Sequence, residues 1–167
     1  SQPPGSPAAL ALLEPAFALL GRSHAAGISH EDLHFGNFLR HGGALHLIDG
    51  DAVRAHAALP ERIAARDLAT LIAQLPWAWD EHLAPLLAAY RAACAHAPSD
   101  ELLGRALRAR RAWRLRDYLA KTVRDCTLFR VSKSFGRYVA VVRSEAARLE
   151  ALLADPDAAM ARGVALK

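Results

Sequence analysis

One segment without helical periodicity, residues 28–51, interrupts a chain that is otherwise patterned for helices. Within it, Gly36-Asn37 marks a turn. Two short apolar runs, Phe38–Arg40 and Leu45–Ile48, lie on either side of the pair Gly42-Gly43. Runs of this kind around a glycine pair are typical of a β-hairpin. The sequence therefore predicts a mainly α fold that carries one small hairpin in its N-terminal third.

Apolar residues recur at three- and four-residue spacing through the remaining chain, which predicts a series of helices. The expected helices are residues 8–26, 59–75, 77–97, 100–124 and 136–153. Pro15 falls inside the first of them, so that helix is expected to begin or to kink there. Strand and helix patterns do not alternate, which argues against a doubly wound parallel sheet. We expect residues 1–7 to form a linker, residues 126–134 to be less regular, and residues 155–167 to form a tail.

The formal net charge of +4 is spread unevenly along the chain. Residues 1–100 carry six Arg and ten acidic residues, a balance of −4, whereas residues 101–150 carry 13 Lys or Arg and five acidic residues, a balance of +8. The basic stretch predicts an acidic partner, such as a phosphorylated sugar, an anionic lipid surface or nucleic acid. The plainer alternative is a solvated Arg-rich helix face with some i,i+4 pairing. Aromatic residues are not interleaved as in a platform for single-stranded nucleic acid, so nucleic acid is not the partner we expect.

The length of 167 residues suits one domain with its own core. Cys94 and Cys126 stand far apart and indicate neither a zinc site nor a disulfide framework. No run reaches the roughly 18 apolar residues that a transmembrane helix needs. The first residues, Ser1–Pro7, lack the basic start and apolar core of a signal peptide. We therefore expect a reduced, cytoplasmic setting.

The aperiodic segment contains the pattern His30-x-Asp32-x-x-x-x-Asn37, and Asp49 follows the expected hairpin. These residue types suit phosphoryl transfer, in which catalysis is mostly positioning and electrostatics. One carboxylate must orient the attacking hydroxyl and accept its proton, and we assign this role to Asp32. A second carboxylate must hold the metal ion that bridges the nucleotide phosphates, and we assign this role to Asp49. Asn37 is the expected second metal ligand, because Mg²⁺ prefers oxygen ligands and retains several waters.

This pattern resembles the catalytic loop of protein kinases and of their small-molecule relatives. Asp49 resembles the metal-binding Asp of the Asp-Phe-Gly position, although Gly50-Asp51 follows it here. The resemblance implies that His30 orients the loop and takes no direct chemical part. Asp67, within Arg66-Asp67-Leu68-Ala69, resembles the Asp that anchors the loop backbone from the next helix. His30 and Asp67 are therefore expected to support the loop, and the cofactors implied are ATP and Mg²⁺.

Within this superfamily the chain is most similar to the bacterial lipopolysaccharide kinases, the family of Kdo and core-heptose kinases. Two stretches carry the likeness, the motif from His30 to Asp51 and the segment Tyr118–Phe129. The likeness extends over roughly residues 10–145. It implies ATP-dependent phosphorylation of a sugar hydroxyl on an anionic glycolipid acceptor. It also implies a cytoplasmic enzyme that can touch the inner face of the cytoplasmic membrane.

The resemblance implies that residues 8–154 form the C-terminal lobe of a kinase-like fold, with the catalytic loop at residues 28–51. Fewer than 30 residues precede His30, and no glycine-rich phosphate loop or early Lys is found among them. The β-rich N-terminal lobe is therefore expected to be absent from this chain. We expect the chain alone to bind ATP weakly or not at all.

Several alternatives stay open. His34 can contact substrate or phosphate, or simply face solvent. Asp51 can assist metal binding or pair with Arg54 or another nearby Arg. The chain can also be a small-molecule kinase of the aminoglycoside or choline type, or a truncated pseudokinase that acts as a binding module.

Overall fold

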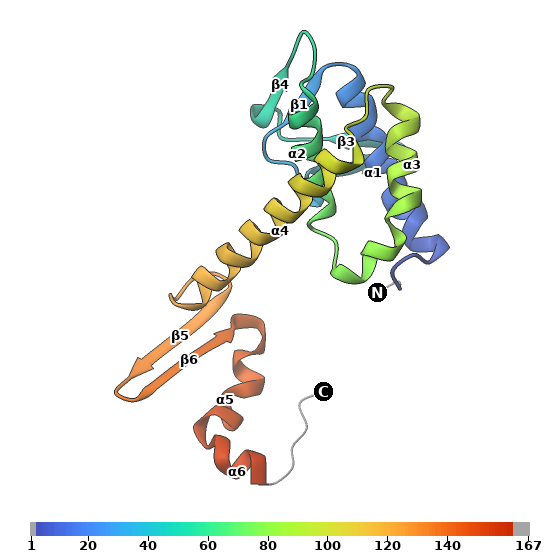
Figure 1. Ribbon diagram of the computed structural model, residues 1–167. Coiled ribbons are helices and arrows are strands. Elements are labelled where there is room, and N and C mark those ends of the chain that lie inside the picture. The colour runs from blue at the N-terminus through green and yellow to red at the C-terminus, as the bar shows by residue number, and fades with distance from the viewer. Residues whose placement is uncertain (1–2, 162–167) are drawn as a thin grey trace. The chain divides into compact units, whose positions relative to one another are not determined.

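The computed structural model describes residues 3–161 and is mainly helical, as the sequence predicts (Figure 1). The chain divides into two compact units, residues 1–112 and residues 113–167, and each is described by itself. Residues 1–2 of the expected linker and residues 162–167 of the expected tail lie outside the described residues. None of the described helices has the length and apolar character needed to cross a membrane.

The first unit is built on helices whose apolar faces meet in one core. The α-helices are α1 (Pro7–Ala25), α2 (Glu61–Ile72), α3 (Leu83–Ala93) and α4 (Asp100–Thr122), the last of which contains the boundary between the units. Helix α1 lies along α3 (Figure 1), and the two approach closely at Gly21, where a Cβ atom would stand 2.5 Å from the Tyr90 carbonyl oxygen. Phe17 of α1, Leu71 of α2 and Leu86 of α3 are fully buried in the core that these helices share. The missing side chain at Gly21 is therefore what permits this packing.

Helix α1 matches the sequence prediction closely. It begins at Pro7, and the Ser6 hydroxyl accepts a hydrogen bond from the Ala9 amide at 3.3 Å. Proline is favoured in the first helical turn, where its missing N–H has no partner to lose. Pro15 lies inside the continuous helix, which neither begins nor ends there.

The predicted hairpin is confirmed by strands β2 (Phe38–His41) and β3 (Ala44–Leu47), which pair antiparallel with Phe38 opposite Leu47. Gly42 and Gly43 form the turn with φ values of 56° and 79°, a backbone conformation that favours glycine. The prediction of a single sheet is wrong, because β1 (Ile28–His30) and β4 (Val53–Ala55) also pair antiparallel. Short 3₁₀ turns complete the segment at η1 (Phe35–Asn37) and η2 (Gly50–Ala52).

The single helix expected over residues 77–97 is also wrong. Residues Trp77–His82 form the 3₁₀ turn η3, and the α-helix α3 begins only at Leu83. Pro85 explains the break, because its ring clashes with the carbonyl group four residues earlier in any continuous α-helix. In the first turn of α3 the same proline breaks no hydrogen bond, because amides there have no partner within the helix.

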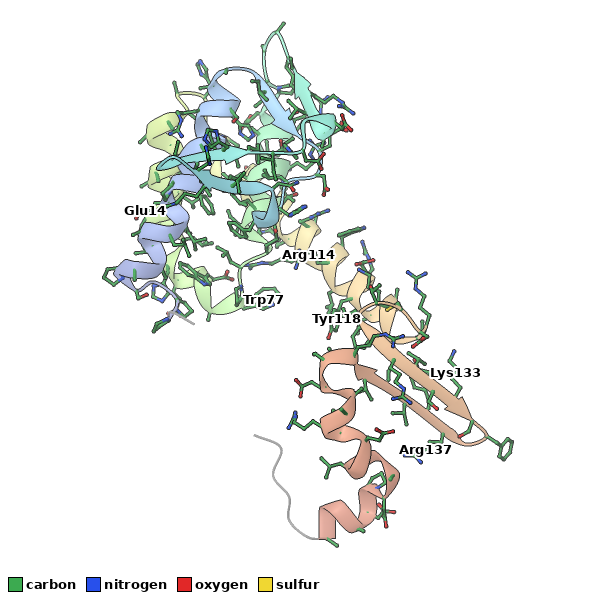
Figure 2. All side chains as sticks on the ribbon, turned by 180° about the vertical axis from the view of Figure 1, so that it is seen from behind. Glu14, Trp77, Arg114, Tyr118, Lys133 and Arg137 are labelled. Carbon is green, nitrogen blue, oxygen red and sulfur yellow. The ribbon has the colours of Figure 1, made fainter. Side chains whose placement is uncertain are left out.

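The second unit holds a third sheet, which the sequence reading missed. Strands β5 (Phe129–Ser134) and β6 (Arg137–Val142) pair antiparallel, where the sequence predicted irregular chain followed by a helix from residue 136 (Figure 2). All residues from Tyr138 to Val142 except Ala140 are aromatic or β-branched, which favours a strand. After the 3₁₀ turn η4 (Arg143–Glu145), helix α5 (Ala146–Ala154) and helix α6 (Pro156–Ala161) follow, the latter inside the expected tail.

Candidate active site

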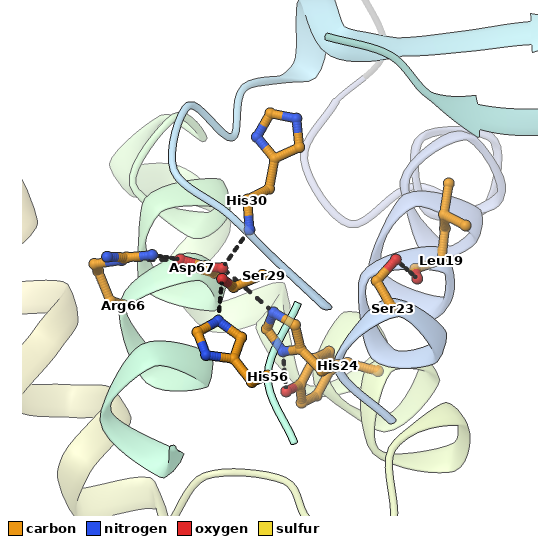
Figure 3. A network of polar contacts seen from close by, with 9 residues as sticks. Leu19, Ser23, His24, Ser29, His30, His56, Arg66 and Asp67 are labelled. Carbon is orange, nitrogen blue, oxygen red and sulfur yellow. Dashed lines mark hydrogen bonds and ion pairs between the residues drawn. The ribbon is translucent and has the colours of Figure 1, made fainter. Parts of the chain in front are cut away.

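The candidate catalytic loop is anchored in the core through Asp67 of α2, which is 1% exposed. One carboxylate oxygen of Asp67, Oδ2, accepts a hydrogen bond from the His30 main-chain amide at 2.9 Å. The other, Oδ1, accepts two bonds from the Arg66 guanidinium at 2.9 and 2.8 Å. Figure 3 shows these contacts converging on Asp67 from the loop and from its own helix. Asp67 thus lies where the resemblance expects the loop anchor.

His24 of α1 completes this network. Its Nε2 lies 3.6 Å from Asp67 Oδ2, and its Nδ1 lies 2.8 Å from the Tyr90 hydroxyl (Figure 3). Ionised Asp67 only accepts hydrogen bonds, so an attractive contact requires the proton on Nε2. Nδ1 then accepts from the Tyr90 hydroxyl, whose pKa is raised by burial. At 3.6 Å the His24–Asp67 contact is longer than a normal hydrogen bond and acts mainly as a charge–dipole contact.

The pKa of Asp67 reflects two opposing effects. Burial alone would raise the pKa of this carboxyl group. Contacts with His24, with the His30 amide and with Arg66 outweigh burial and hold the pKa below its ordinary value of 3.8. Asp67 is therefore ionised at neutral pH and serves as a fixed acceptor for the loop.

Gln74 makes a second anchor that the sequence reading missed. Its side-chain oxygen accepts a hydrogen bond from the Phe35 amide at 3.0 Å, and its nitrogen donates to the Leu33 carbonyl at 3.1 Å. Both bonded groups belong to the loop between His30 and Asn37. The amide group of one glutamine thus fixes the loop backbone on both its donor and its acceptor side. A single glutamine after a helix leaves no pattern in the sequence that would have indicated this role.

The end of the loop is fixed by Asn37, whose side chain is buried. Its Nδ2 donates to the Asp32 main-chain carbonyl at 2.9 Å, which identifies the nitrogen because a carbonyl can only accept. The amide oxygen Oδ1 is thereby turned away from this bond and left for another partner. The Asn37 main-chain carbonyl accepts from the Ile48 amide at 2.8 Å, which links the loop to the end of β3.

Asp49 follows directly after this link. Its φ of 71° and ψ of 65° place it in the left-handed region, where it is the one non-glycine residue with positive φ among residues 3–161. Aspartate tolerates this conformation better than most residues but at some cost in backbone energy. The His30 ring also contacts the residue before Asp49, because its Nε2 lies 3.2 Å from the Ile48 carbonyl oxygen. The carboxylates of Asp32 and Asp49 are thus carried by segments that share hydrogen bonds.

The remaining candidate residues lie at the surface. The Asp32 side chain is 70% exposed, and His34 Nε2 lies 3.9 Å from its carboxylate. Asp51 is exposed and accepts a bond from Arg54 through its main-chain carbonyl at 2.8 Å. Arg54 forms its ion pair with Glu31 at 3.0 Å, so the carboxylate of Asp51 is not its salt-bridge partner.

The donor set fits a weakly held Mg²⁺ ion better than a tightly held transition metal. Asn37 Oδ1 and the Asp49 carboxylate are both oxygen donors, which Mg²⁺ prefers. Within the described part of the chain, no group of three or more His, Cys, Asp or Glu side chains is arranged to bind a metal ion. Asn37 and Asp49 are therefore the two residues that would hold a metal ion at this site.

Comparison with known proteins gave no relative: no family model, no curated protein and no solved structure matches this chain. Membership of the kinase-like superfamily accordingly stays a prediction.

Proposed function

We propose that this chain is the catalytic lobe of an ATP-dependent phosphotransferase. Its acceptor in this proposal is a sugar hydroxyl of the lipopolysaccharide core, on Kdo or heptose. Asp32 orients the hydroxyl and accepts its proton. Asn37 and Asp49 supply the protein oxygens that hold Mg²⁺, and His30 and Asp67 keep the loop in shape.

The observation that supports this proposal best is the bond from the Asn37 side chain to the Asp32 carbonyl. It gives Asn37 two separate functions, because the nitrogen fixes the loop and the oxygen remains available to a cation. The bond between Asn37 and Ile48 then brings the residue before Asp49 to the same point of the loop. A general base and an oxygen-ligand pair on one hydrogen-bonded scaffold are what phosphoryl transfer needs.

Each acidic residue has the exposure its proposed function requires. The Asp32 carboxylate is largely open to solvent, so an acceptor hydroxyl can approach it, while its main chain is fixed by Asn37. Asn37 and Asp49 would hold Mg²⁺, which would supply positive charge to neutralise the charge that develops on the transferred phosphoryl group. Asp49 is exposed, which suits a cation that keeps part of its water shell.

The charge distribution favours an anionic acceptor over a cationic one. Residues 101–150 carry a net charge of +8, which attracts phosphorylated or carboxylated sugars. A kinase for aminoglycosides needs an acidic surface for its cationic substrate. The small-molecule alternative is therefore supported less well than the glycolipid one.

Manganese binding followed by NMR tests the metal site. Mn²⁺ broadens signals of nearby amides even when it binds weakly, and Mg²⁺ should compete with it. We expect broadening centred on Asn37 and Asp49 that is lost in Asp49→Asn. Asparagine is the matched replacement, because it tolerates the left-handed backbone and removes only the charge. Asp51→Asn, two residues away and also exposed, tests whether Asp51 assists metal binding, and we expect it to keep the broadening.

Phosphate transfer from ATP to a Kdo- or heptose-containing acceptor tests the reaction, assayed with the complete gene product. Asp32→Asn should abolish transfer while Mn²⁺ still binds at Asn37 and Asp49. An unchanged rate in Asp32→Asn would refute the role of Asp32. Binding of Mn²⁺ and ATP without any transfer would instead favour the non-catalytic binding module.

A further inference from the structure

The tip of the β5–β6 hairpin exposes an aromatic side chain without a partner surface. Phe135 has a relative exposure of 108%, the highest of the large hydrophobic residues in the described chain. Ser134 and Arg137 form the last pair of the ladder, so Phe135 and Gly136 are the whole turn. Apart from its two chain neighbours, no residue has an atom within 4 Å of the Cβ position of Gly136, so the space at this point of the turn is open. A single exposed apolar side chain is common on protein surfaces, so Phe135 indicates a partner only together with the charged residues around it.

The strands behind this tip carry only positive charge. Residues 129–142 contain Arg130, Lys133 and Arg137 and no Asp or Glu. Figure 2 shows Lys133 and Arg137 on the two strands next to the turn. The Lys133 ammonium lies 5.6 Å from the ring centroid of Tyr138, which is half exposed. The tip therefore combines an apolar end with cations and a half-exposed tyrosine just behind it.

One face of the hairpin adds a hollow lined with hydrogen-bond donors. Arg130, Ser132 and Ser134 alternate along β5, and Arg137 lies opposite Ser134 on β6. These four side chains line a cavity of about 330 Å³, which Glu150 of α5 also lines. Guanidinium and hydroxyl groups together suit phosphate oxygens. The cavity begins one residue away from the exposed Phe135.

We propose that the β5–β6 hairpin docks on an anionic lipid bilayer, with Phe135 in the interface and with Lys133 and Arg137, each two residues from Phe135, at the level of the lipid phosphates. The Tyr138 hydroxyl donates a hydrogen bond to the Thr122 carbonyl, so Phe135 is the aromatic side chain that enters the interface. Basic residues next to the membrane add attraction that depends on anionic lipid and on salt. A single Phe covers far less area than a stable protein interface, which buries about 800 Å² per partner. The tip thus suits a bilayer better than a second copy of the chain.

Vesicle sedimentation tests this proposal without any phosphotransfer, so its failure and that of the proposed kinase activity are distinguishable. The full chain is mixed with vesicles of phosphatidylcholine alone or with added phosphatidylglycerol. We expect binding to the phosphatidylglycerol vesicles and its loss in high salt. Phe135→Ser should weaken this binding about tenfold, as expected from removing one buried aromatic side chain from the interface. Lys133→Glu should weaken it about fivefold or more.

Two further variants make the test specific. Leu12→Ser, on α1 of the first unit, replaces another well-exposed apolar residue and should bind like the unmodified chain. Phe135→Trp should bind anionic vesicles like the unmodified chain, and the fluorescence emission of the added tryptophan should shift to shorter wavelength on binding. Equal binding to both kinds of vesicle, or unchanged binding by Phe135→Ser, would overturn the proposal. So would a dimer that Phe135→Ser disrupts in the absence of vesicle binding.

Discussion

The side-chain amide nitrogen of Asn37 lies 2.9 Å from the main-chain carbonyl oxygen of Asp32, five residues earlier. This bond closes the loop that carries the proposed catalytic base. It is made by a side chain that is itself buried, so water does not easily replace it. The geometry of Asp32 thus depends on a residue that we also propose as a metal ligand.

Replacement of Asn37 separates these two functions. Asn37→Asp should destabilise the chain more than Asn37→Ala, although its shape is closer to asparagine. A carboxylate would face the Asp32 carbonyl oxygen and repel it, at a cost of about 2 kcal/mol, whereas alanine loses one bond worth about 1 kcal/mol. Urea denaturation of both variants measures the difference. The opposite order of stability would mean that the amide nitrogen is not the group that holds the loop.

Asp67→Asn should lower the free energy of unfolding by about 3 kcal/mol, because it removes a buried charge that Arg66 and the His30 amide depend on. An amide cannot accept at both ends, so one of these donors loses its partner. Asp51→Asn is the matched control. Asp51 is exposed, and we expect its replacement to change the stability by less than about 0.5 kcal/mol.

The same residue should make stability depend on pH in the acidic range. The pKa of Asp67 is lower in the folded chain than its ordinary value of 3.8. The contribution of ionised Asp67 to the free energy of unfolding is therefore fully present above about pH 5. It declines as the pH falls through 3.8 toward the pKa of Asp67 in the folded chain. The gap in unfolding free energy between the unmodified chain and Asp67→Asn should narrow from pH 7 to pH 3. A gap that stays constant would contradict the ionised state of Asp67 that we infer.

Parts of the loop could be foreseen from sequence, and parts could not. The spacing from His30 to Asp49 is a local pattern, so the sequence alone predicts these candidate loop residues. The left-handed backbone of Asp49 and the two bonds from Gln74 arise only when distant segments meet. No local propensity reports such contacts, so they had to come from the structure.

The strands show the same division. The turn Gly42-Gly43 between two apolar runs predicted β2 and β3 correctly, because hairpin turns have strong local signals. The β1–β4 pair joins segments about 25 residues apart and had no such signal. After the turn at Phe135-Gly136, the Val-rich strand β6 is followed within a few residues by the Ala- and Leu-rich helix α5. Because the helical pattern of α5 is the stronger signal, the sequence predicted one helix over both segments. Strand preference depends more on context than helix preference does.

Arg111 of α4 should stabilise the first unit more than the exposed arginines of the same helix. Its guanidinium contacts Asp80 through two bonds, one of 2.8 Å, and lies 4.2 Å from the ring centroid of Trp77. Its side chain is only 13% exposed, which limits screening by water. Arg111→Ala should cost about 1–2 kcal/mol in urea denaturation.

Arg105 on the same helix supplies the control for Arg111. It lies 3.8 Å from Glu101, and both side chains are well exposed, so Arg105→Ala should change the stability by less than about 0.5 kcal/mol. Arg111→Lys should recover only part of the loss, because an ammonium cannot make the two parallel bonds. Equal effects of Arg111→Ala and Arg105→Ala would show that the contacts with Asp80 and Trp77 contribute little.

Two helical glycines should respond to the same substitution with opposite sign. Alanine normally stabilises a helix relative to glycine, by up to about 1 kcal/mol, because it restricts the unfolded chain. A Cβ atom at Gly104 of α4 would meet only the flexible end of Arg108, at 3.4 Å, so Gly104→Ala should gain this stability.

At Gly21 of α1 the new Cβ would stand 2.5 Å from the Tyr90 carbonyl oxygen and 2.9 Å from the Ala93 Cβ. These are backbone and short side-chain atoms that cannot turn aside, so α1 and α3 must move apart. Gly21→Ala should therefore lose about 1–3 kcal/mol despite the better helix propensity of alanine. Thermal and urea denaturation of the two variants measure both signs, and a stabilised Gly21→Ala would refute the close contact between α1 and α3.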